Sequence, residues 1–290
     1  MKIKDMFKDG RQVFSLEIFP PKRDYPIETI YKTLDELKDI RPDFISVTYG
    51  ASGSERGSRT FDIASQIKKR YGIESASHLT CVNATRDEIA ELLDILEDDG
   101  IENIMALRGD DVPDETKDDD FRYASDLISF IKSSGHDFGI SGACYPETHM
   151  NSRNQVEDII NLKKKVDAGA EHLMSQLFFD NNVFYDFIEK ARIAGINVPI
   201  EAGIMPVVNV KQITRLVSLC GASIPPKFAK MMQRYEDDPE AIMDAGIAYA
   251  VDQIVDLLSQ GVDGIHLYTM NKPEVAKRIN DSVKHLFRRP

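Results

Sequence analysis

Short apolar segments alternate with helical patterns along the whole chain, and this alternation constrains the fold more than any other feature. Eight segments have the length and composition of buried strands: 13–19, 44–49, 75–81, 102–109, 137–145, 172–179, 199–206 and 264–271. Apolar residues spaced three and four apart predict helices at 27–37, 85–100, 153–168, 181–194, 209–220, 239–259 and 272–286. Eight strands that alternate with helices predict an α/β fold of the closed (β/α)8 type, the TIM barrel.

A short repeat supports this prediction. A glycine, a few residues and then the next apolar segment recur in GIENI (100–104), GAEHL (169–173), GINVP (195–199) and GVDGI (261–265). No linker rich in Pro, Gly or Ser divides the chain, so we expect one catalytic barrel domain over residues 1–290. A doubly wound open sheet is the competing fold, but it is expected to carry a glycine-rich turn after its first strand, and this chain has none there.

Charge and composition exclude several classes of protein. The net charge of -12 and the pI near 5.0 argue against a general affinity for nucleic acid or anionic membranes, while a local basic pocket stays open. The three cysteines show no disulfide or metal-ligand spacing, as expected in a reducing compartment. The N-terminus has no apolar leader and no stretch is long enough to span a membrane, so we expect a cytoplasmic protein.

Polar side chains gather at the ends of the expected strands, whereas the strand interiors are mostly apolar. In a barrel these ends form one face, where active sites are built. Each residue alone has an ordinary structural explanation, such as a salt bridge or a loop anchor, but their joint occurrence predicts an active site. The residues are Glu17, Thr48, His78, Thr80, Arg108, Asp110, Tyr145, Gln176, Tyr268 and Asn271.

Motifs for other chemistries are absent from the sequence. There is no HExxH or other metal-ligand spacing among the six histidines, and no GxSxG, GxxxxGK[ST] or GxGxxG motif. In the helix expected at 153–168, Asp158, Asn161 and Lys165 share one face. A solvated charged face is the ordinary explanation, and a functional one requires a phosphate for Lys164 or Lys165 to bind.

Ten ordered segments resemble the methylenetetrahydrofolate reductase family, in its compact bacterial form, along essentially the whole chain. They are LEIFPPK (16–22), SVTYGA (46–51), HLTC (78–81), ALRGD (106–110), YASDL (123–127), YPE (145–147), NLKKKVDAGA (161–170), QLFFD (176–180), GIMPV (203–207) and HLYTMN (266–271). We therefore expect no regulatory domain like that of the eukaryotic form. The sequence departs from the family at Lys272, at Leu216 and in a longer loop at 51–60.

The resemblance implies an FAD-dependent oxidoreductase. NADH or NADPH reduces the flavin and leaves, and the reduced flavin then passes hydride to 5,10-methylenetetrahydrofolate, which becomes 5-methyltetrahydrofolate for methionine synthesis. The implied partners are these small molecules and further copies of the chain in a homo-oligomer, with no nucleic acid, membrane or metal.

The resemblance also assigns residues to roles. Glu17 is implied as the general acid for folate N10, Asp110 as the aspartate near flavin and pterin, and Gln176, Gln212 and Lys272 as substrate-binding. Desolvation at the barrel mouth is expected to let Glu17 hold a proton near neutral pH. The implied FAD-binding residues are Thr48, Tyr49, Ala51, His78, Arg108, Gly109, Asp110, Tyr123, Ala124, Tyr145, His149, Ser152, Asp158, Asn161, Lys164 and Lys165.

Two other functions stay open at this point. A metal-dependent lyase or hydrolase on the same barrel would use His78 and the carboxylates, and a non-catalytic protein would bind flavin or folate without turnover. Colour separates the first from the reductase, because a flavoprotein purifies yellow.

Overall fold

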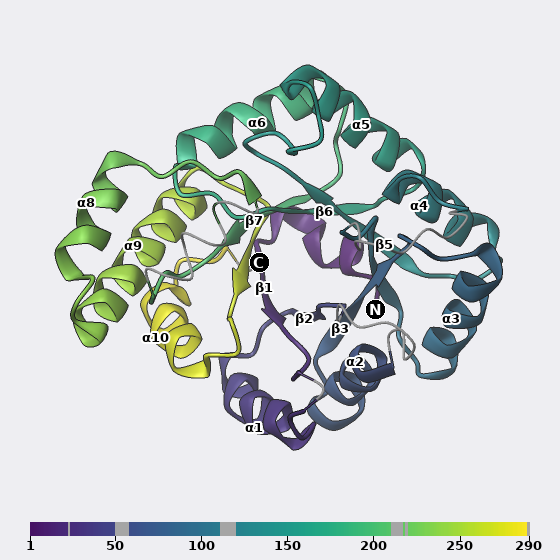
Figure 1. Ribbon diagram of the computed structural model, residues 1–290, viewed down its shortest axis with the longest axis horizontal. Coiled ribbons are helices and arrows are strands. Elements are labelled where there is room, and N and C mark those ends of the chain that lie inside the picture. The colour runs from purple at the N-terminus through teal and green to yellow at the C-terminus, as the bar shows by residue number, and fades with distance from the viewer. Residues whose placement is uncertain (23, 50–57, 111–119, 210–216, 218–219, 289–290) are drawn as a thin grey trace.

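Eight parallel strands close into a barrel in the order in which they occur along the chain (Figure 1). The computed structural model describes residues 1–22, 24–49, 58–110, 120–209, 217 and 220–288. The strands are β1 (Val13–Ile18), β2 (Phe44–Val47), β3 (Glu74–Thr80), β4 (Asn103–Leu107), β5 (Gly139–Cys144), β6 (His172–Ser175), β7 (Ile200–Ile204) and β8 (Gly264–Tyr268). Each strand pairs in parallel with its neighbours, and β8 closes on β1, so the predicted (β/α)8 barrel is confirmed.

Helices form an outer ring around the strands (Figure 1). They are α1 (Glu28–Leu37), the short η2 (Lys38–Ile40), α2 (Ser58–Tyr71), α3 (Arg86–Asp98), α4 (Ala124–Ser133), α5 (Gln155–Asp167), α6 (Asn181–Ile193), α8 (Pro226–Tyr235), α9 (Pro239–Ser259) and α10 (Pro273–Val283). Six of the predicted helices are confirmed within a few residues, whereas most of 209–220 lies outside the described residues. No helix in the described part of the chain is long and apolar enough to cross a membrane.

The two faces of each strand differ in polarity. On β1, Phe14, Leu16 and Ile18 point outward and pack under the helices in the main hydrophobic core. Alternation then turns Ser15 and Glu17 into the barrel. The expectation that strand interiors are mostly apolar is therefore wrong for the inward face, which carries the buried polar residues Ser15, Ser46, His78, Ser141, His172, Glu201 and His266.

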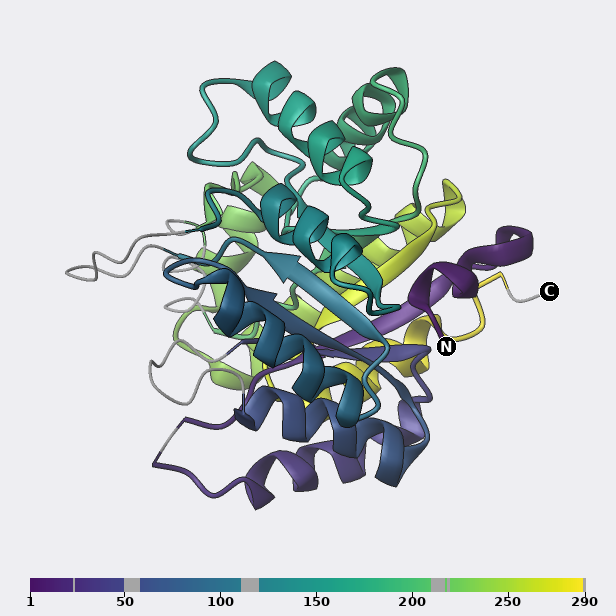
Figure 2. The same ribbon diagram turned by 90° about the vertical axis from the view of Figure 1, so that its right-hand side faces the viewer.

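The N-terminal segment closes one end of the barrel. The 3-10 segment η1 (Ile3–Gly10) lies at the end from which the strands start (Figure 2). Ile3 and Met6 are buried there with inward residues of β1, β2, β4 and β6. The Phe7 ring stacks on that of His172, with 5.0 Å between ring centroids. The barrel therefore has a closed end, sealed by η1, and an open end where the strands finish.

Candidate functional site

Glu17 is held rigidly at the open end by the residues that follow β8. The Thr269 hydroxyl donates to the Glu17 carbonyl oxygen at 2.6 Å, and the Thr269 backbone N–H donates to it at 3.2 Å. Asn271 brackets Phe19, accepting from its N–H at 2.9 Å and donating to its carbonyl at 2.8 Å. These contacts continue the β1–β8 pairing past the strand ends and fix the direction of the Glu17 side chain.

Glu17 is only 7% exposed, and its carboxylate faces two imidazoles inside the barrel. Glu17 Oε2 lies 3.4 Å from His266 Nε2 and 3.5 Å from both His78 Nε2 and the Ser46 hydroxyl. We call these four residues the open-end group. The carboxylate is thus buried beside partners for its charge.

The pKa of Glu17 differs from the expectation. Burial alone raises it, as expected, but the hydrogen bond from His266 and the charges of His78 and His266 lower it, and the balance lies below the usual value. Burial lowers the pKa of His78 in turn. Desolvation therefore does not keep a proton on Glu17 by itself, and the proton belongs to the open-end group as a whole.

A second carboxylate and imidazole lie deeper in the barrel. Glu201 Oε2 is 3.0 Å from His172 Nε2, and both side chains are at most 1% exposed. We call this pair the closed-end group. Neither residue is among the predicted site residues, because the histidines are scattered along the sequence. The signal was present in PIEAGIMP, where an acid interrupts an otherwise apolar strand.

Several predicted FAD-binding residues come together beyond β5. Asp158 of α5 accepts from the His149 backbone N–H and from the Ser152 hydroxyl, both at 3.0 Å. The rings of Tyr145 and His149 meet edge to face with 4.5 Å between centroids. Lys165 Nζ donates to the Ala143 carbonyl at 2.6 Å and lies 5.7 Å from the centre of the Tyr145 ring.

Positive charge converges on this cluster. Burial lowers the pKa of His149, while Asp158 raises it and both Lys165 and Arg108 lower it further. Burial also lowers the pKa of Lys165. Three basic side chains, from the loops after β4 and β5 and from α5, therefore lie within electrostatic reach of one another, which fits a diphosphate.

Gly109 is required where the loops after β3 and β4 cross. Its φ is +90°, and a Cβ atom there would lie 2.7 Å from Val82 Cγ1. The Val82 N–H donates to the Arg108 carbonyl at 2.7 Å, which ties the two loops together. Asp110, the next residue, is exposed beyond this crossing.

The remaining predicted residues are spread around the open end. Thr48 accepts at its carbonyl from Thr60, and the Tyr49 ring packs against Phe61. Gln176 uses its own side-chain oxygen to accept from the Leu177 N–H at 2.9 Å. Three more predicted residues lie near the start of helices. Tyr123 is 54% exposed, Ala124 is the first residue of α4, and Lys272 is exposed just before α10. Ala51, Gln212 and Leu216 lie outside the described residues.

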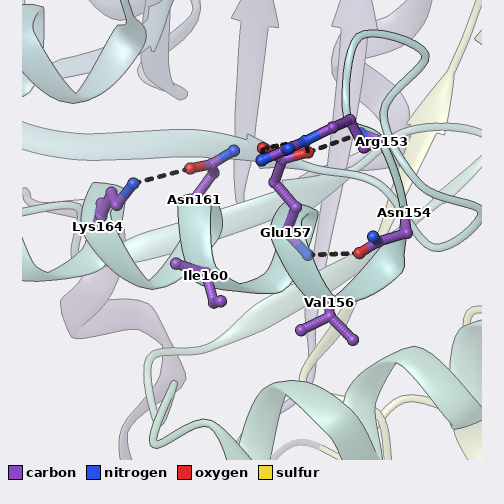
Figure 3. A pocket seen from close by; sticks show the side chains of 7 residues that line it. All are labelled: Arg153, Asn154, Val156, Glu157, Ile160, Asn161 and Lys164. Atoms are coloured by element: carbon purple, nitrogen blue, oxygen red, sulfur yellow. Dashed lines mark hydrogen bonds and ion pairs between the residues drawn. The ribbon is translucent and has the colours of Figure 1, made fainter.

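The helix α5 divides its predicted residues between two surfaces. Asn161 and Lys164 line a shallow depression on the helix surface with Arg153, Asn154, Val156, Glu157 and Ile160 (Figure 3). There Lys164 Nζ donates to Asn161 Oδ1 at 3.1 Å, and Arg153 pairs with Glu157. Asp158 and Lys165 belong to the β5 cluster instead. Over the described ranges, no three His, Cys, Asp or Glu side chains are arranged to hold a metal ion.

The sequence is similar to proteins of one family. The family model described as methylenetetrahydrofolate reductase matches residues 2–284. The 5,10-methylenetetrahydrofolate reductases of Pectobacterium carotovorum and Escherichia coli are each 40% identical over 93% of this chain, and the matches cover 89% and 90% of those proteins. Methylenetetrahydrofolate reductase (NADH) 1 of Arabidopsis thaliana is 36% identical over 93% of this chain, which spans 48% of that longer protein.

A solved structure shares the fold at low identity. It is a protein from Clostridium thermocellum that binds two copies of 5-methyl-5,6,7,8-tetrahydrofolic acid. The TM-score is 0.66 at 16% identity, and the match covers 98% of this chain and 99% of that one. The likeness supports the barrel fold, and the sequence matches establish the family. The chain belongs to the methylenetetrahydrofolate reductase family.

Proposed function

We propose that this chain reduces 5,10-methylenetetrahydrofolate to 5-methyltetrahydrofolate with NADH or NADPH as the electron donor and FAD as the bound cofactor. The observation that carries the proposal is the open-end group, in which a buried carboxylate near the end of β1 faces two imidazoles. The names of the relatives support the reaction. The product would supply methyl groups for methionine synthesis.

The residues of the β5 cluster suit FAD. In this proposal Lys165, Arg108 and His149 meet the diphosphate and Asp158 accepts from ribose hydroxyls, which is supported by the proximity of the four side chains. A carboxylate has about four lone-pair sites, so Asp158 keeps acceptor capacity beyond its bonds to Ser152 and His149. When bound, FAD supplies the hydride that it has taken from the nicotinamide.

Glu17 delivers the proton that the folate needs. The proton passes from a Glu17 oxygen to folate N10, the bond from N10 to the methylene carbon breaks, and the resulting iminium carbon accepts hydride. Ser46 and His78, each 3.5 Å from Glu17 Oε2, face the carboxylate left on Glu17. Burial shields Glu17 from water, because the residue is only 7% exposed.

Two other residues suit the substrates. Asp110 is exposed beyond β4, where a carboxylate accepts from the adjacent N–H groups of a pterin edge. Gln176 accepts from Leu177 with its oxygen, so its NH2 group is the part that it offers to folate or nicotinamide. The substrate contacts of Gln212 and Lys272, the cytoplasmic location and the homo-oligomer stay predictions from the sequence.

An absorption spectrum of the purified protein tests the proposal. We expect flavin bands near about 380 and 450 nm that bleach anaerobically with NADH or NADPH and return with methylenetetrahydrofolate. A colourless protein that takes up no added FAD would contradict the proposal of a flavoenzyme. Metal analysis would then test the alternative of a metal-dependent lyase or hydrolase. Bound flavin that neither nucleotide reduces would favour a binding protein.

A further inference from the structure

A continuous line of buried polar side chains joins the closed-end group to the open-end group. From β5 to β6, Ser141 Oγ lies 2.9 Å from His172 Nδ1. From β7 to β1, the Ser15 hydroxyl donates to Glu201 Oε1 at 2.8 Å. Ser15 Oγ also lies 2.7 Å from His266 Nδ1, and the other nitrogen of that ring faces Glu17.

Gly264 makes this line possible. It lies on β8, opposite Glu201 of β7 on one side and Val13 of β1 on the other. A Cβ atom at Gly264 would lie 3.0 Å from Glu201 Cγ, 3.2 Å from its Oε1 and 2.7 Å from the Val13 carbonyl oxygen. The missing side chain therefore lets Glu201 pass over β8 to reach Ser15.

The number of protons fixes the direction of these hydrogen bonds. The Ser15 hydroxyl has one proton, which it donates to Glu201 Oε1. Ser15 Oγ must then accept from its other neighbour, so the proton of that contact lies on His266 Nδ1. A neutral His266 ring with a proton on Nδ1 presents the lone pair of Nε2 to Glu17.

The contacts at the other end agree with this direction. A hydroxyl proton donated from Ser141 to His172 Nδ1 leaves the His172 proton on Nε2, which faces Glu201 Oε2 at 3.0 Å. The two atoms are in contact without the angle of a hydrogen bond. A proton at this position stabilises Glu201 as a carboxylate, and a carboxylate accepts from Ser15.

We propose that Glu201 and Ser15 are positioning residues that fix the His266 ring with its proton on Nδ1, so that Glu17 and His266 Nε2 share a single proton. Glu17 gives this proton to the substrate, which leaves Glu17 as a carboxylate and the His266 ring neutral and still protonated on Nδ1. A solvent proton then restores the pair through the open end. Only the link to folate rests on the proposed function.

The other groups around the His266 ring make contacts that do not involve Nδ1, so Ser15 is the partner of that nitrogen. His78 of β3 faces Glu17, and Tyr268 of β8 meets the His266 ring edge to face at 5.2 Å between centroids. Phe44 of β2 stacks at 6.4 Å. The charged and titratable groups that bear on the ring are thus Glu17, His78, Tyr268, Glu201 and, behind Glu201, His172.

The test is the position of the His266 proton, read from the nitrogen-15 shifts of the ring by NMR. The signal is assigned by its loss in His266→Gln. In the wild-type protein we expect the neutral His266 ring to carry its proton on Nδ1. A neutral ring with its proton on Nε2 would overturn the proposal.

Three variants separate positioning from general damage. Glu201→Met removes the acceptor, so the Ser15 proton is free to turn to His266 Nδ1, and we expect the neutral ring to carry its proton on Nε2. Ser15→Ala removes the partner of Nδ1 and has the same expected result. Ser75→Ala, a matched change at a buried hydroxyl of β3 that lies outside this line, should leave the His266 shifts unchanged. Wild-type shifts in both Glu201→Met and Ser15→Ala would overturn the assignment.

Half-reaction kinetics then connect the proton to turnover. In Glu201→Met we expect the folate step to be about tenfold slower near pH 7 and its pH profile to move to lower pH, because general acid catalysis supplies about 100-fold or more. Reduction of the flavin by nicotinamide should be unchanged. The NMR result does not depend on folate, so a wild-type protein without folate activity would refute the proposed function and leave the His266 assignment to be judged separately.

Discussion

Two carboxylates, each facing imidazole, lie in the same barrel, and access distinguishes them. Glu17 is 7% exposed beneath the open end, whereas Glu201 is fully buried behind η1. Glu17 faces two imidazoles and its carbonyl accepts from Thr269, while Glu201 faces one imidazole. In the proposed function the open-end carboxylate delivers a proton and the closed-end carboxylate fixes a ring, and the two differ in what seals each end of the barrel.

The largest expected effect comes from the open end. Glu17→Gln removes the proton donor but keeps the shape, so we expect the folate half-reaction to slow about 1000-fold, within the usual range for general acids. FAD should remain bound and reducible by NADH or NADPH, as measured by anaerobic stopped-flow absorbance. If the nicotinamide step were lost and the folate step kept, the role of Glu17 would be refuted.

Gly264→Ala tests the clearance that the closed-end carboxylate needs. The added Cβ meets Glu201 and the Val13 carbonyl, and such overpacking costs about 1–3 kcal/mol of the free energy of unfolding. Urea denaturation measures it. Gly142→Ala on β5 is the matched control, since its Cβ would meet only side chains, at 3.4 Å or more. Equal stabilities for the two variants would argue against a tight passage at Gly264.

The open end should also make the fold sensitive to acid. Burial lowers the pKa of His78 in the folded state, so below its unfolded pKa of about 6.5 the unfolded chain binds more protons and stability falls. The lowered pKa of Glu17 matters at lower pH. It contributes free energy of unfolding that is fully present above the unfolded pKa of about 4.3 and is lost as the pH falls through the folded pKa.

We therefore expect the loss of unfolding free energy between about pH 7.5 and 5.5 to shrink by about 1 kcal/mol in His78→Asn, since one pKa unit corresponds to about 1.4 kcal/mol. Denaturant titrations at the two pH values measure it. The exposed His285 offers the control His285→Asn, which should keep the wild-type difference. The same pH dependence in His78→Asn would show that this imidazole is not the source.

The smallest effect is on a thiol at the margin of the open end. Burial raises the pKa of Cys144 to about 12, despite the nearby Lys165. We expect Cys144 to resist alkylation at about pH 8, because the thiolate is the reactive form. Mass spectrometry of the native and the unfolded protein measures this. If native Cys144 were modified as fast as the half-buried Cys220, the Cys144 thiol would be accessible to solvent, which would contradict its burial.

The barrel could be predicted from the sequence because its strands are buried on both sides. Outward residues such as Leu16 and Ile265 make each strand segment mostly apolar. The predicted bounds of all eight strands therefore agree with the structure within a few residues. The helices α2, α4 and α8 were not identified. In α8 only Phe228 and Met232 are buried, so its apolar stripe is too narrow to recognise.

The site could be predicted only in part. Position at a strand end selected Glu17, His78 and Tyr145, because all strand ends of a barrel share one face. The line from Glu201 to Glu17 could not be predicted, because Ser15 and Glu201 are 186 residues apart and meet only when Gly264 lets one side chain cross a strand. Such contacts depend on the register of the closed barrel and leave little local pattern.

A double-mutant cycle on the folate half-reaction tests most directly whether the two ends act as one device. Single-turnover rates would be measured for the wild type, Glu17→Gln, Glu201→Met and the double variant. If Glu201 acts only through Glu17, the double variant should be no slower than Glu17→Gln alone, although Glu201→Met by itself is about tenfold slower than wild type. Losses that multiply would contradict the account, because Glu201 would then act without Glu17.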